Sequence, residues 1–195
     1  MTFSGKVVII TGASSGIGAE AARDFSKLAA NVVLVGRNLE NLQKVAAECG
    51  SLENILLVQA DVTVAGDPEK IVNDTLKKFG KIDVLVNNAG ILETGTIENT
   101  SLEQYDRVMN TNIRSIYHLT MLAVPYLIKT EGNIVNISSV NGIRSFPGVL
   151  AYNISKAAVD QFTRCVALEL APKKVRVNSV NPGKILNVVF LFFVD

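Results

Sequence analysis

Six short runs of mainly β-branched and aliphatic residues recur along this chain, and longer segments with the apolar spacing of helices lie between them. A short apolar run of this kind predicts a strand buried on both faces of a sheet. Strands that alternate with helices of ten or more residues predict an α/β fold with a doubly wound parallel sheet. The predicted strands are Lys6–Ile10, Asn31–Val35, Asn54–Gln59, Ile82–Val86, Asn133–Ile137 and Val175–Val180, and the predicted helices are Ala19–Ala30, Leu39–Cys49, Pro68–Phe79, Leu102–Lys129 and Ala151–Leu170.

Composition narrows the class of protein. Hydrophobic residues make up 48% of the 195 positions and charged residues 19%, which argues against intrinsic disorder. Nineteen Lys and Arg residues stand against eighteen Asp and Glu residues, so no charge excess indicates nucleic acid or a membrane surface. No apolar run approaches the roughly 20 residues of a membrane span, and the N-terminus lacks a signal-peptide pattern. We therefore expect a cytoplasmic protein.

Cysteine and histidine are too few for the commonest metal and nucleophile sites. Cys49 and Cys165 lie far apart, in no metal-binding spacing, and we expect both to be reduced and buried. The single histidine, His118, argues against a Ser-His-Asp triad and against a multi-histidine zinc site. We expect no metal, and a surface or interface position for His118.

The turn after the first predicted strand, Thr11–Gly18, reads TGASSGIG. Glycines let a backbone turn tightly and let a phosphate approach the N-terminus of the following helix. The Ser14 and Ser15 hydroxyls could add hydrogen bonds there. An ordinary glycine-rich loop is the alternative, but the position directly after the first strand favours a dinucleotide site.

Polar residues follow the next three strands. Arg37 follows the second strand, and no acidic residue appears before Glu40, which favours NADP(H) over NAD(H) because an arginine accommodates a 2′-phosphate. A solvated surface arginine is the alternative. Asp61 could bind an adenine amino group or cap the segment that leads to Pro68. In Asn87–Gly90 the asparagines can satisfy loop backbone groups, and the small residues leave room for a ribose.

The strongest constellation is Ser139 with Tyr152 and Lys156. Tyr152 and Lys156 are four residues apart and therefore share one face of a helix. A nearby ammonium favours the phenolate and lowers the pKa of a tyrosine, which makes it usable in acid–base chemistry. Ser139 ends the fifth strand, where its hydroxyl could hold a substrate oxygen. A surface Tyr/Lys pair without chemistry is the alternative.

These motifs together resemble the short-chain dehydrogenase/reductase family of Rossmann type, particularly its 3-oxoacyl-carrier-protein-reductase-like members. The resemblance implies an NADP(H)-dependent oxidoreductase that moves a hydride between the nicotinamide and a small-molecule ketone or secondary alcohol. The matching segments appear in the family's order and are Thr11–Gly18, Asn87–Gly90, Asn112 within MNTNIRS, Ser139, Tyr152–Lys156 and Asn181–Gly183.

The resemblance also implies a role for each residue. Tyr152 is then the general acid or base, Lys156 holds the nicotinamide ribose and lowers the pKa of Tyr152, and Ser139 orients the substrate oxygen. Asn112 completes the catalytic set by holding a water that relays protons from Lys156. The implied cofactor contacts are Gly12, Ser14, Ser15, Ile17 and Gly18 at the pyrophosphate and ribose, Arg37 at the 2′-phosphate, Asp61 and Val62 at the adenine, Asn88 and Gly90 at the adenosine ribose, and Pro182, Gly183 and Ile185 beside the nicotinamide.

The sequence departs from the family after Gly183. Ile185 fits an apolar position of the family, Asn187 stands where a threonine is usual, and apolar residues then run to the end. We expect one dinucleotide-binding and catalytic domain over residues 1–184, an apolar tail over residues 185–195, and about six strands, without the family's usual seventh strand and substrate lid.

Two expectations depend on that departure and on the long helices. A catalytically impaired protein that binds nucleotide or pairs subunits is the alternative to an active enzyme, because the family's lid closes over substrate. The apolar surfaces of helices 102–129 and 151–170 favour a homo-oligomer, with burial in the core as the competing interpretation.

Overall fold

The computed structural model describes residues 3–183, which contain a parallel six-stranded sheet. The strand order is β3-β2-β1-β4-β5-β6, so the chain begins in the middle of the sheet, winds to one edge, and returns across β1 to build the other half. The predicted doubly wound α/β fold is confirmed. The strands are β1 (Val7–Thr11), β2 (Asn31–Gly36), β3 (Ile55–Gln59), β4 (Val84–Asn87), β5 (Asn133–Ile137) and β6 (Arg176–Val180).

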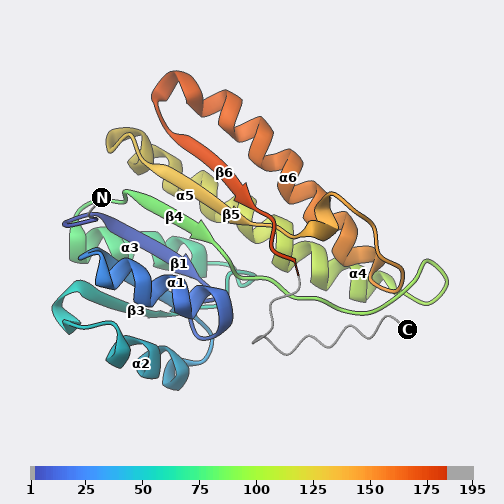
Figure 1. Ribbon diagram of the computed structural model, residues 1–195, viewed down its shortest axis with the longest axis horizontal. Helices are drawn as coiled ribbons and strands as arrows, with labels where there is room; N and C mark the ends of the chain where they lie inside the picture. The colour runs from blue at the N-terminus through green and yellow to red at the C-terminus, as the bar shows by residue number, and fades with distance from the viewer. Residues whose placement is uncertain (1–2, 184–195) are drawn as a thin grey trace.

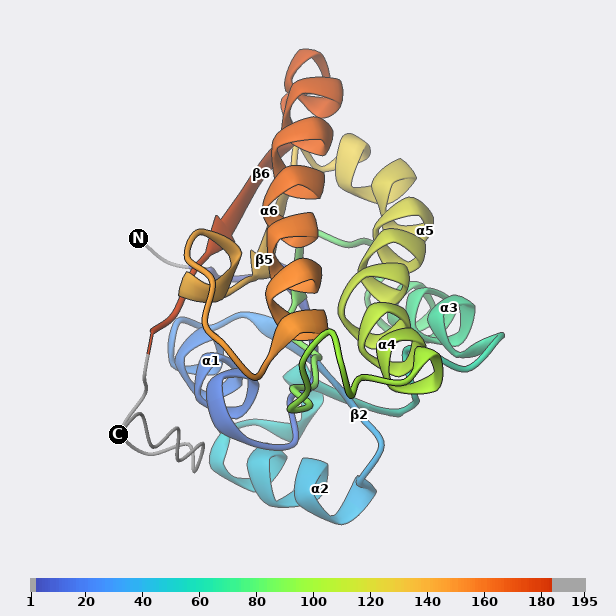
Figure 2. The same cartoon turned by 90° about the vertical axis from the view of Figure 1, so that its right-hand side faces the viewer.

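Helices cover both faces of the sheet (Figures 1 and 2). Helices α1 and α2 pack on one face, where Val8 and Ile10 of β1 point. Helices α3, α5 and α6 pack on the other face, where Val7 and Ile9 point. The helices are α1 (Gly16–Lys27), α2 (Leu39–Glu48), α3 (Asp67–Phe79), α4 (Leu102–Met109), α5 (Ser115–Lys129) and α6 (Leu150–Leu170).

The predicted helix over Leu102–Lys129 is interrupted. A π-helical turn spans Asn110–Arg114 between α4 and α5, and the Ser115 N–H bonds to the carbonyl five residues earlier. Such turns cluster at functional sites because they displace one side chain from the regular helical position. Here the displaced region holds Asn112, which is fully buried.

Two smaller expectations also need correction, and one lies outside the described residues. Helix α1 begins at Gly16 rather than Ala19. The low helix propensity of Gly16 and Gly18 made the sequence-based prediction start the helix too late. Cys49 is buried as expected, but Cys165 is exposed on α6, where its sulfur accepts a hydrogen bond from Gln161. The expected tail, with Ile185, lies outside the described residues.

No helix of residues 3–183 is long and apolar enough to cross a membrane, and that part of the chain holds no cluster of metal-ligating side chains.

The amino end of the sheet is fastened by a buried carboxylate. Asp83 precedes β4, is 3% exposed, and accepts hydrogen bonds from the Lys6 ammonium at 2.8 Å and from the Val7 backbone N–H at 2.9 Å. Lys81 lies 3.0 Å from its second oxygen. Burial raises the pKa of the Asp83 carboxyl, but these contacts outweigh burial and hold that pKa below its usual range.

Replacing Asp83 with Asn should lower the free energy of unfolding at pH 7 by about 1–3 kcal/mol, since charged hydrogen bonds to a buried acceptor are lost. A depressed pKa stabilises the folded state above the unfolded pKa of about 4 and stops doing so as pH falls through the folded value. The difference between wild type and Asp83→Asn in urea denaturation should therefore be constant from pH 7 to 5 and shrink below about pH 4.

The exposed pair Asp24–Lys27 provides the control. Asp24→Asn should leave the denaturation midpoint unchanged, because exposed ion pairs contribute little. Equal effects of the two substitutions would contradict the anchoring role of Asp83.

Candidate active site

Glycine is required twice in the loop that joins β1 to α1. Gly12 has a φ of 66°, in the left-handed region that residues with a Cβ rarely adopt. A Cβ on Gly18 would overlap the Gly12 carbonyl oxygen, so the first turn of α1 lies directly against the loop. Ser15 is the N-cap residue, and its hydroxyl makes no capping bond. The loop thus presents Ser14, Ser15 and a helix N-terminus, a combination that favours an anion.

Hydrogen bonds tie this loop to the loop after β4. The Asn88 Nδ2 donates to the Thr11 carbonyl at 2.9 Å and to the Gly12 carbonyl at 3.2 Å. In return, the Thr11 hydroxyl accepts from the backbone N–H groups of Asn88 and Ala89, both at 3.0 Å. Asn88 therefore supports the glycine-rich loop.

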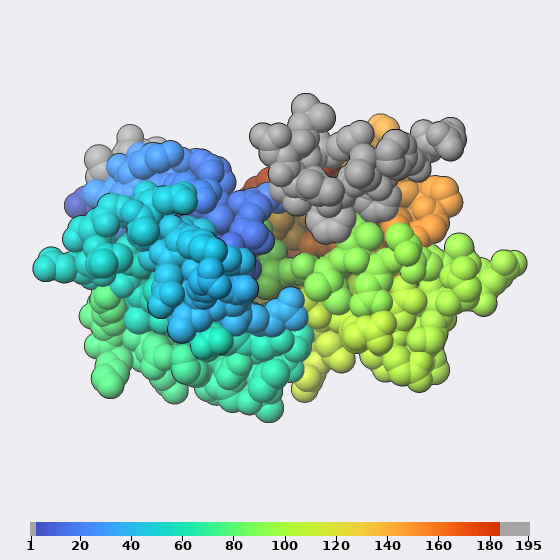
Figure 3. Space-filling view, turned by 90° about the horizontal axis from the view of Figure 1, so that it is seen from below, coloured from blue at the N-terminus to red at the C-terminus, as the bar shows by residue number. Residues whose placement is uncertain are grey.

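An open cavity of about 260 Å³ lies at the carboxyl ends of β1, β2, β3 and β4. Figure 3 shows the surface hollowed between the blue N-terminal segments and the green segments of the middle of the chain. Ile17 and Gly18 are not among its lining residues. Eight residues that we expected to bind the cofactor line it, namely Gly12, Ser14, Ser15, Arg37, Asp61, Val62, Asn88 and Gly90.

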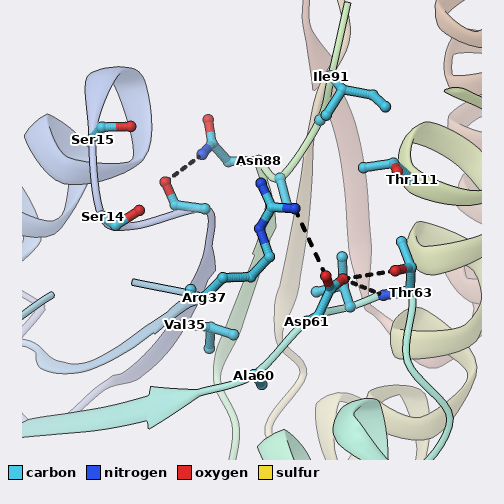
Figure 4. Close-up of a pocket in the computed structure, with 15 residues that line it drawn as sticks. Ser14, Ser15, Val35, Arg37, Ala60, Asp61, Thr63, Asn88, Ile91 and Thr111 are labelled. Atoms are coloured by element: carbon cyan, nitrogen blue, oxygen red, sulfur yellow. Dashed lines mark hydrogen bonds and ion pairs between the residues drawn. The ribbon is translucent and has the colours of Figure 1, made fainter. Parts of the chain in front are cut away.

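Arg37 and Asp61 face each other at this cavity (Figure 4). The Arg37 Nη1 lies 3.8 Å from the Asp61 Oδ2, and the Arg37 side chain is 75% exposed. The other Asp61 oxygen accepts from the Thr63 N–H and hydroxyl at 2.9 and 2.7 Å. The Asp61 carboxylate thus caps the turn that leads toward Pro68, which was one of its two expected roles, while Gly66 is the N-cap of α3 itself. Its second oxygen stays toward Arg37.

A second group of side chains surrounds α6, and Asn112 is buried within it. The Asn112 Oδ1 accepts from the Ile91 N–H at 2.8 Å, and its Nδ2 donates to the Ile91 carbonyl and the Ser155 hydroxyl, each at 2.9 Å. The Ser155 hydroxyl donates to the Tyr152 carbonyl at 2.8 Å. Asn112 therefore connects the loop after β4 to α6.

The Lys156 side chain is buried, and its Nζ donates to the Ile137 carbonyl at 2.7 Å. Burial lowers the pKa of Lys156 to about 8. Burial raises the pKa of Tyr152, and a hydrogen bond with Ser139 opposes that rise. The pKa of Tyr152 therefore lies above its ordinary value, because burial outweighs the opposing effect of Ser139. The expected lowering of this pKa by Lys156 stays a prediction. The Lys156 Nζ is directed at the Ile137 carbonyl and lies 5.6 Å from the centre of the Tyr152 ring.

The segment after β6 lies beside Ser139. The Asn181 Nδ2 donates to the Ser139 carbonyl at 3.0 Å, and the Val140 N–H donates to the Pro182 carbonyl at 3.0 Å. A Cβ on Gly183 would be in ordinary contact with Val140, at 3.8 Å. The fold therefore brings Pro182 and Gly183 to the same edge as Ser139, as expected.

The cavity and the second group of side chains meet at Gly90. A Cβ at that position would lie 3.2 Å from the Asn112 Oδ1 and 3.6 Å from the Lys156 Nζ. Gly90 also lines the cavity. Gly90 therefore lies between the cavity and the group of side chains that includes Asn112 and Lys156.

Sequence reasoning missed several lining residues. Gly36 and Ala60 end or follow a strand at the correct edge, so their small size next to Arg37 and Asp61 was an available signal. Thr111 had no signal, because the π-helical turn that brings it to the cavity was not predicted. The missed residues are Val35, Gly36, Ala60, Thr63, Ile91 and Thr111, whereas Ala89, whose small size we expected to leave room for a ribose, also lines the cavity.

Comparison with known proteins agrees with this fold. The family model for short chain dehydrogenases matches residues 6–189, and the chain belongs to that family. The 3-oxoacyl-[acyl-carrier-protein] reductase of Thermotoga maritima is 40% identical over 188 residues, covering 94% of this chain and 75% of that protein. The meso-2,3-butanediol dehydrogenase of Serratia marcescens is 40% identical over 183 residues, covering 94% and 72%.

Solved structures agree as well. A short-chain dehydrogenase/reductase of unknown function from Caenorhabditis elegans, solved with cofactor, superposes with a TM-score of 0.90 at 41% identity, covering 94% of this chain and 71% of the other. The 3-ketoacyl-(acyl-carrier-protein) reductase of Brucella melitensis, complexed with NADH, gives 0.89 at 37% identity, covering 93% and 77%.

Gly18→Ala tests the glycine cradle, the turn Gly12–Gly18 in which α1 packs directly on the Gly12 loop. The added methyl group would meet backbone, which cannot move aside as a side chain can, so we expect a loss of about 1–3 kcal/mol in unfolding free energy. The displaced loop should also weaken binding of a nicotinamide dinucleotide at least tenfold by fluorescence titration. Unchanged affinity in a folded variant would contradict the close packing of α1 on the Gly12 loop.

Proposed function

We propose that this chain is an NADP(H)-dependent oxidoreductase that moves a hydride between the nicotinamide and a small-molecule ketone or secondary alcohol. The observation that carries the proposal is that Gly90 lines the cavity beside the glycine-rich loop and also lies against Lys156, on the helix that carries Tyr152. Membership of a family whose relatives are oxidoreductases supports it.

The residues present fit a dinucleotide cofactor. The Gly12 loop would receive its pyrophosphate, because Gly12, Ser14 and Ser15 line the cavity beside the N-terminus of α1. Asp61 and Val62 would contact the adenine, Asn88 and Gly90 would lie along the ribose side, and Pro182 with Gly183 would border the nicotinamide. When bound, the cofactor supplies or accepts the hydride.

Tyr152 is the proposed acid–base group. Its hydroxyl would give a proton to the carbonyl oxygen during reduction and take one from the alcohol during oxidation. Ser139, whose hydroxyl donates to the Asn141 Oδ1 at 3.2 Å in this structure, would turn to donate to the same oxygen and stabilise developing negative charge. Lys156, which is charged below its pKa of about 8, would hold the nicotinamide ribose. Its positive charge would favour the deprotonated form of Tyr152.

The resemblance gives Asn112 the role of helping to hold a relay water, and that role stays a prediction. In this structure both Nδ2 hydrogens are used by Ile91 and Ser155, and the Oδ1 accepts from the Ile91 N–H. We propose that the side chain fixes the π-helical turn, and that any water relay from Lys156 uses backbone groups of that turn.

Arg37 carries the preference for NADP(H). Its guanidinium is exposed at the cavity, where a 2′-phosphate could accept charge-assisted hydrogen bonds. The competing contact with Asp61 is long and partly exposed, so its loss would cost little.

We also propose a homo-oligomer formed through the long helices. Tyr117 and Met121 on α5 and Leu168 on α6 are 60%, 53% and 79% exposed, and the Tyr117 ring lies 5.8 Å from that of Phe162 on α6. Apolar side chains gathered on neighbouring helices favour burial against a second copy. One functional domain over residues 1–184 and a cytoplasmic location stay predictions.

The test of the function is a titration with NADPH followed by turnover measurements on a panel of ketones. Saturable binding and ketone-dependent oxidation of NADPH would support the proposal. Binding without turnover would favour the alternative of a nucleotide-binding protein without catalysis, and no binding would reject both.

Arg37→Ala should weaken NADPH binding by about 10- to 150-fold, which corresponds to the loss of a charge-assisted hydrogen bond worth about 1.5–3 kcal/mol. NADH affinity should change less than threefold, because NADH lacks the 2′-phosphate. Arg23→Ala, on the exposed surface of α1, is the control. Equal losses for both cofactors would contradict the proposed specificity.

Tyr152→Phe should reduce kcat by at least 100-fold, in line with the loss of a general acid, while the dissociation constant of NADPH stays within about threefold. Lys156→Ala should impair both kcat and NADPH binding. Tyr105→Phe, on α4, is the matched control and should be neutral. Retention of most turnover in Tyr152→Phe would assign the proton to another donor.

A further inference from the structure

Asp160 is a buried carboxylate on α6 that the proposed chemistry does not use. It is 7% exposed, and its hydrogen-bond donor in the described part of the chain is a neutral amide, the Asn181 Nδ2, 3.0 Å from each carboxylate oxygen. The fit is tight, because a Cβ on Gly142 would overlap Asp160. A buried charge without a cation in contact is costly, so its counter-charge must lie nearby.

Lys156 provides that charge. It lies four residues before Asp160, on the same face of α6, and is 4% exposed. Its Nζ donates to the Ile137 carbonyl, so the two charges interact through space without forming a contact ion pair. In a site shielded from water such an interaction is much stronger than at the surface. Consistently, burial lowers the pKa of Lys156, and the charge of Asp160 opposes the lowering.

The other groups around the Lys156 Nζ are uncharged at neutral pH. Strand β5 contributes the Ile137 carbonyl, and the Tyr152 ring lies beside the ammonium on its own helix. The loop after β4 contributes Gly90, and the π-helical turn contributes Asn112. Asp160 is therefore the charged side chain that acts on Lys156.

Asp160 also reaches the rest of the site. The Asn181 amide that binds its carboxylate donates at the same time to the Ser139 carbonyl, at 3.0 Å. The Asp160 carboxylate thus acts on the charge of Lys156 and, through Asn181, also holds the segment that follows β6 in place.

We propose that Asp160 is a positioning residue that acts as the through-space counter-ion of Lys156 and orders Asn181 beside Ser139. The consequence for turnover rests on the proposed function, but the effect on Lys156 does not. Asp160 touches neither substrate nor cofactor in this account.

The direct test is an NMR titration of Lys156 in the full chain with isotope-labelled lysine side chains, assigned by the loss of its resonance in Lys156→Met. Asp160→Asn keeps the shape and one acceptor oxygen but removes the charge. The Lys156 titration midpoint should fall by about one pH unit. Asp83→Asn removes an equally buried carboxylate at the opposite end of the strands and should leave that midpoint unchanged.

Asp160→Glu should restore most of the wild-type midpoint because it restores the charge. Should Asp160→Asn fail to fold, Asp160→Ser removes the same charge while keeping a hydroxyl near Asn181, and the same fall is expected. An unchanged Lys156 midpoint in a folded, uncharged variant would overturn the proposal.

Kinetics supply the second readout. The alkaline limb of the kcat profile should move to lower pH in Asp160→Asn by the amount seen for Lys156, with kcat at acidic pH preserved within about threefold. A uniform fall in kcat at every pH would indicate a merely structural role and overturn the proposal. Absence of turnover in the wild type would reject the proposed function, while the NMR titration would still test Asp160.

Discussion

The hydrogen bonds between Thr11 and Asn88 hold together the two loops on which the site depends. They join the ends of β1 and β4, the neighbouring strands at which the winding of the sheet reverses. At such a reversal the loops that follow the strands diverge to opposite faces and leave a crevice. In this chain the crevice is the cavity at Gly12 and Gly90, and the Asn88 amide sets the separation of its walls.

Buried asparagine side chains also link separate segments of the chain deeper in the core. Asn87 donates to Asn136 at 2.8 Å, and Asn136 donates to Thr163 at 2.9 Å, so β4, β5 and α6 are linked through the core. Such links favour one relative position of these strands and helices. In any other position a buried amide would lose its hydrogen-bond partner, which costs free energy. Together with Asn112 and Asn181 they fix α6, which carries Tyr152 and Lys156, relative to the sheet edge.

The fold was predictable because its determinants are local. Buried parallel strands are short apolar runs, and helix periodicity identified α2, α3 and α6 to within one residue at each end. Contacts between distant segments were not predictable. The π-helical turn at Asn110–Arg114 has helix-compatible residues, and it forms around the bonds of Asn112 to Ile91, which lies 21 residues earlier.

In the site, too, local features could be predicted from the sequence and contacts between distant segments could not. Arg37, Asp61 and the glycines of the first turn were found because each directly follows a strand at the carboxyl edge. Asp160 gave no signal, because its partners are Asn181 and, through space, Lys156, and only the packed structure shows that it is buried. The distribution of charge around Lys156 therefore needed coordinates, whereas the identity of Lys156 did not.

Hydride transfer between a nicotinamide and a carbonyl carbon is the reaction that we propose for this site, and an isotope label on the nicotinamide tests it. The full chain is incubated with NADPH deuterated at the transferable position of the nicotinamide and with a ketone, and the alcohol is analysed by mass spectrometry. We expect an alcohol that carries one deuterium on its carbinol carbon, formed by the wild type and not by Tyr152→Phe. NADPH binding with no labelled alcohol from any ketone tested would show that the site does not transfer a hydride to a carbonyl carbon.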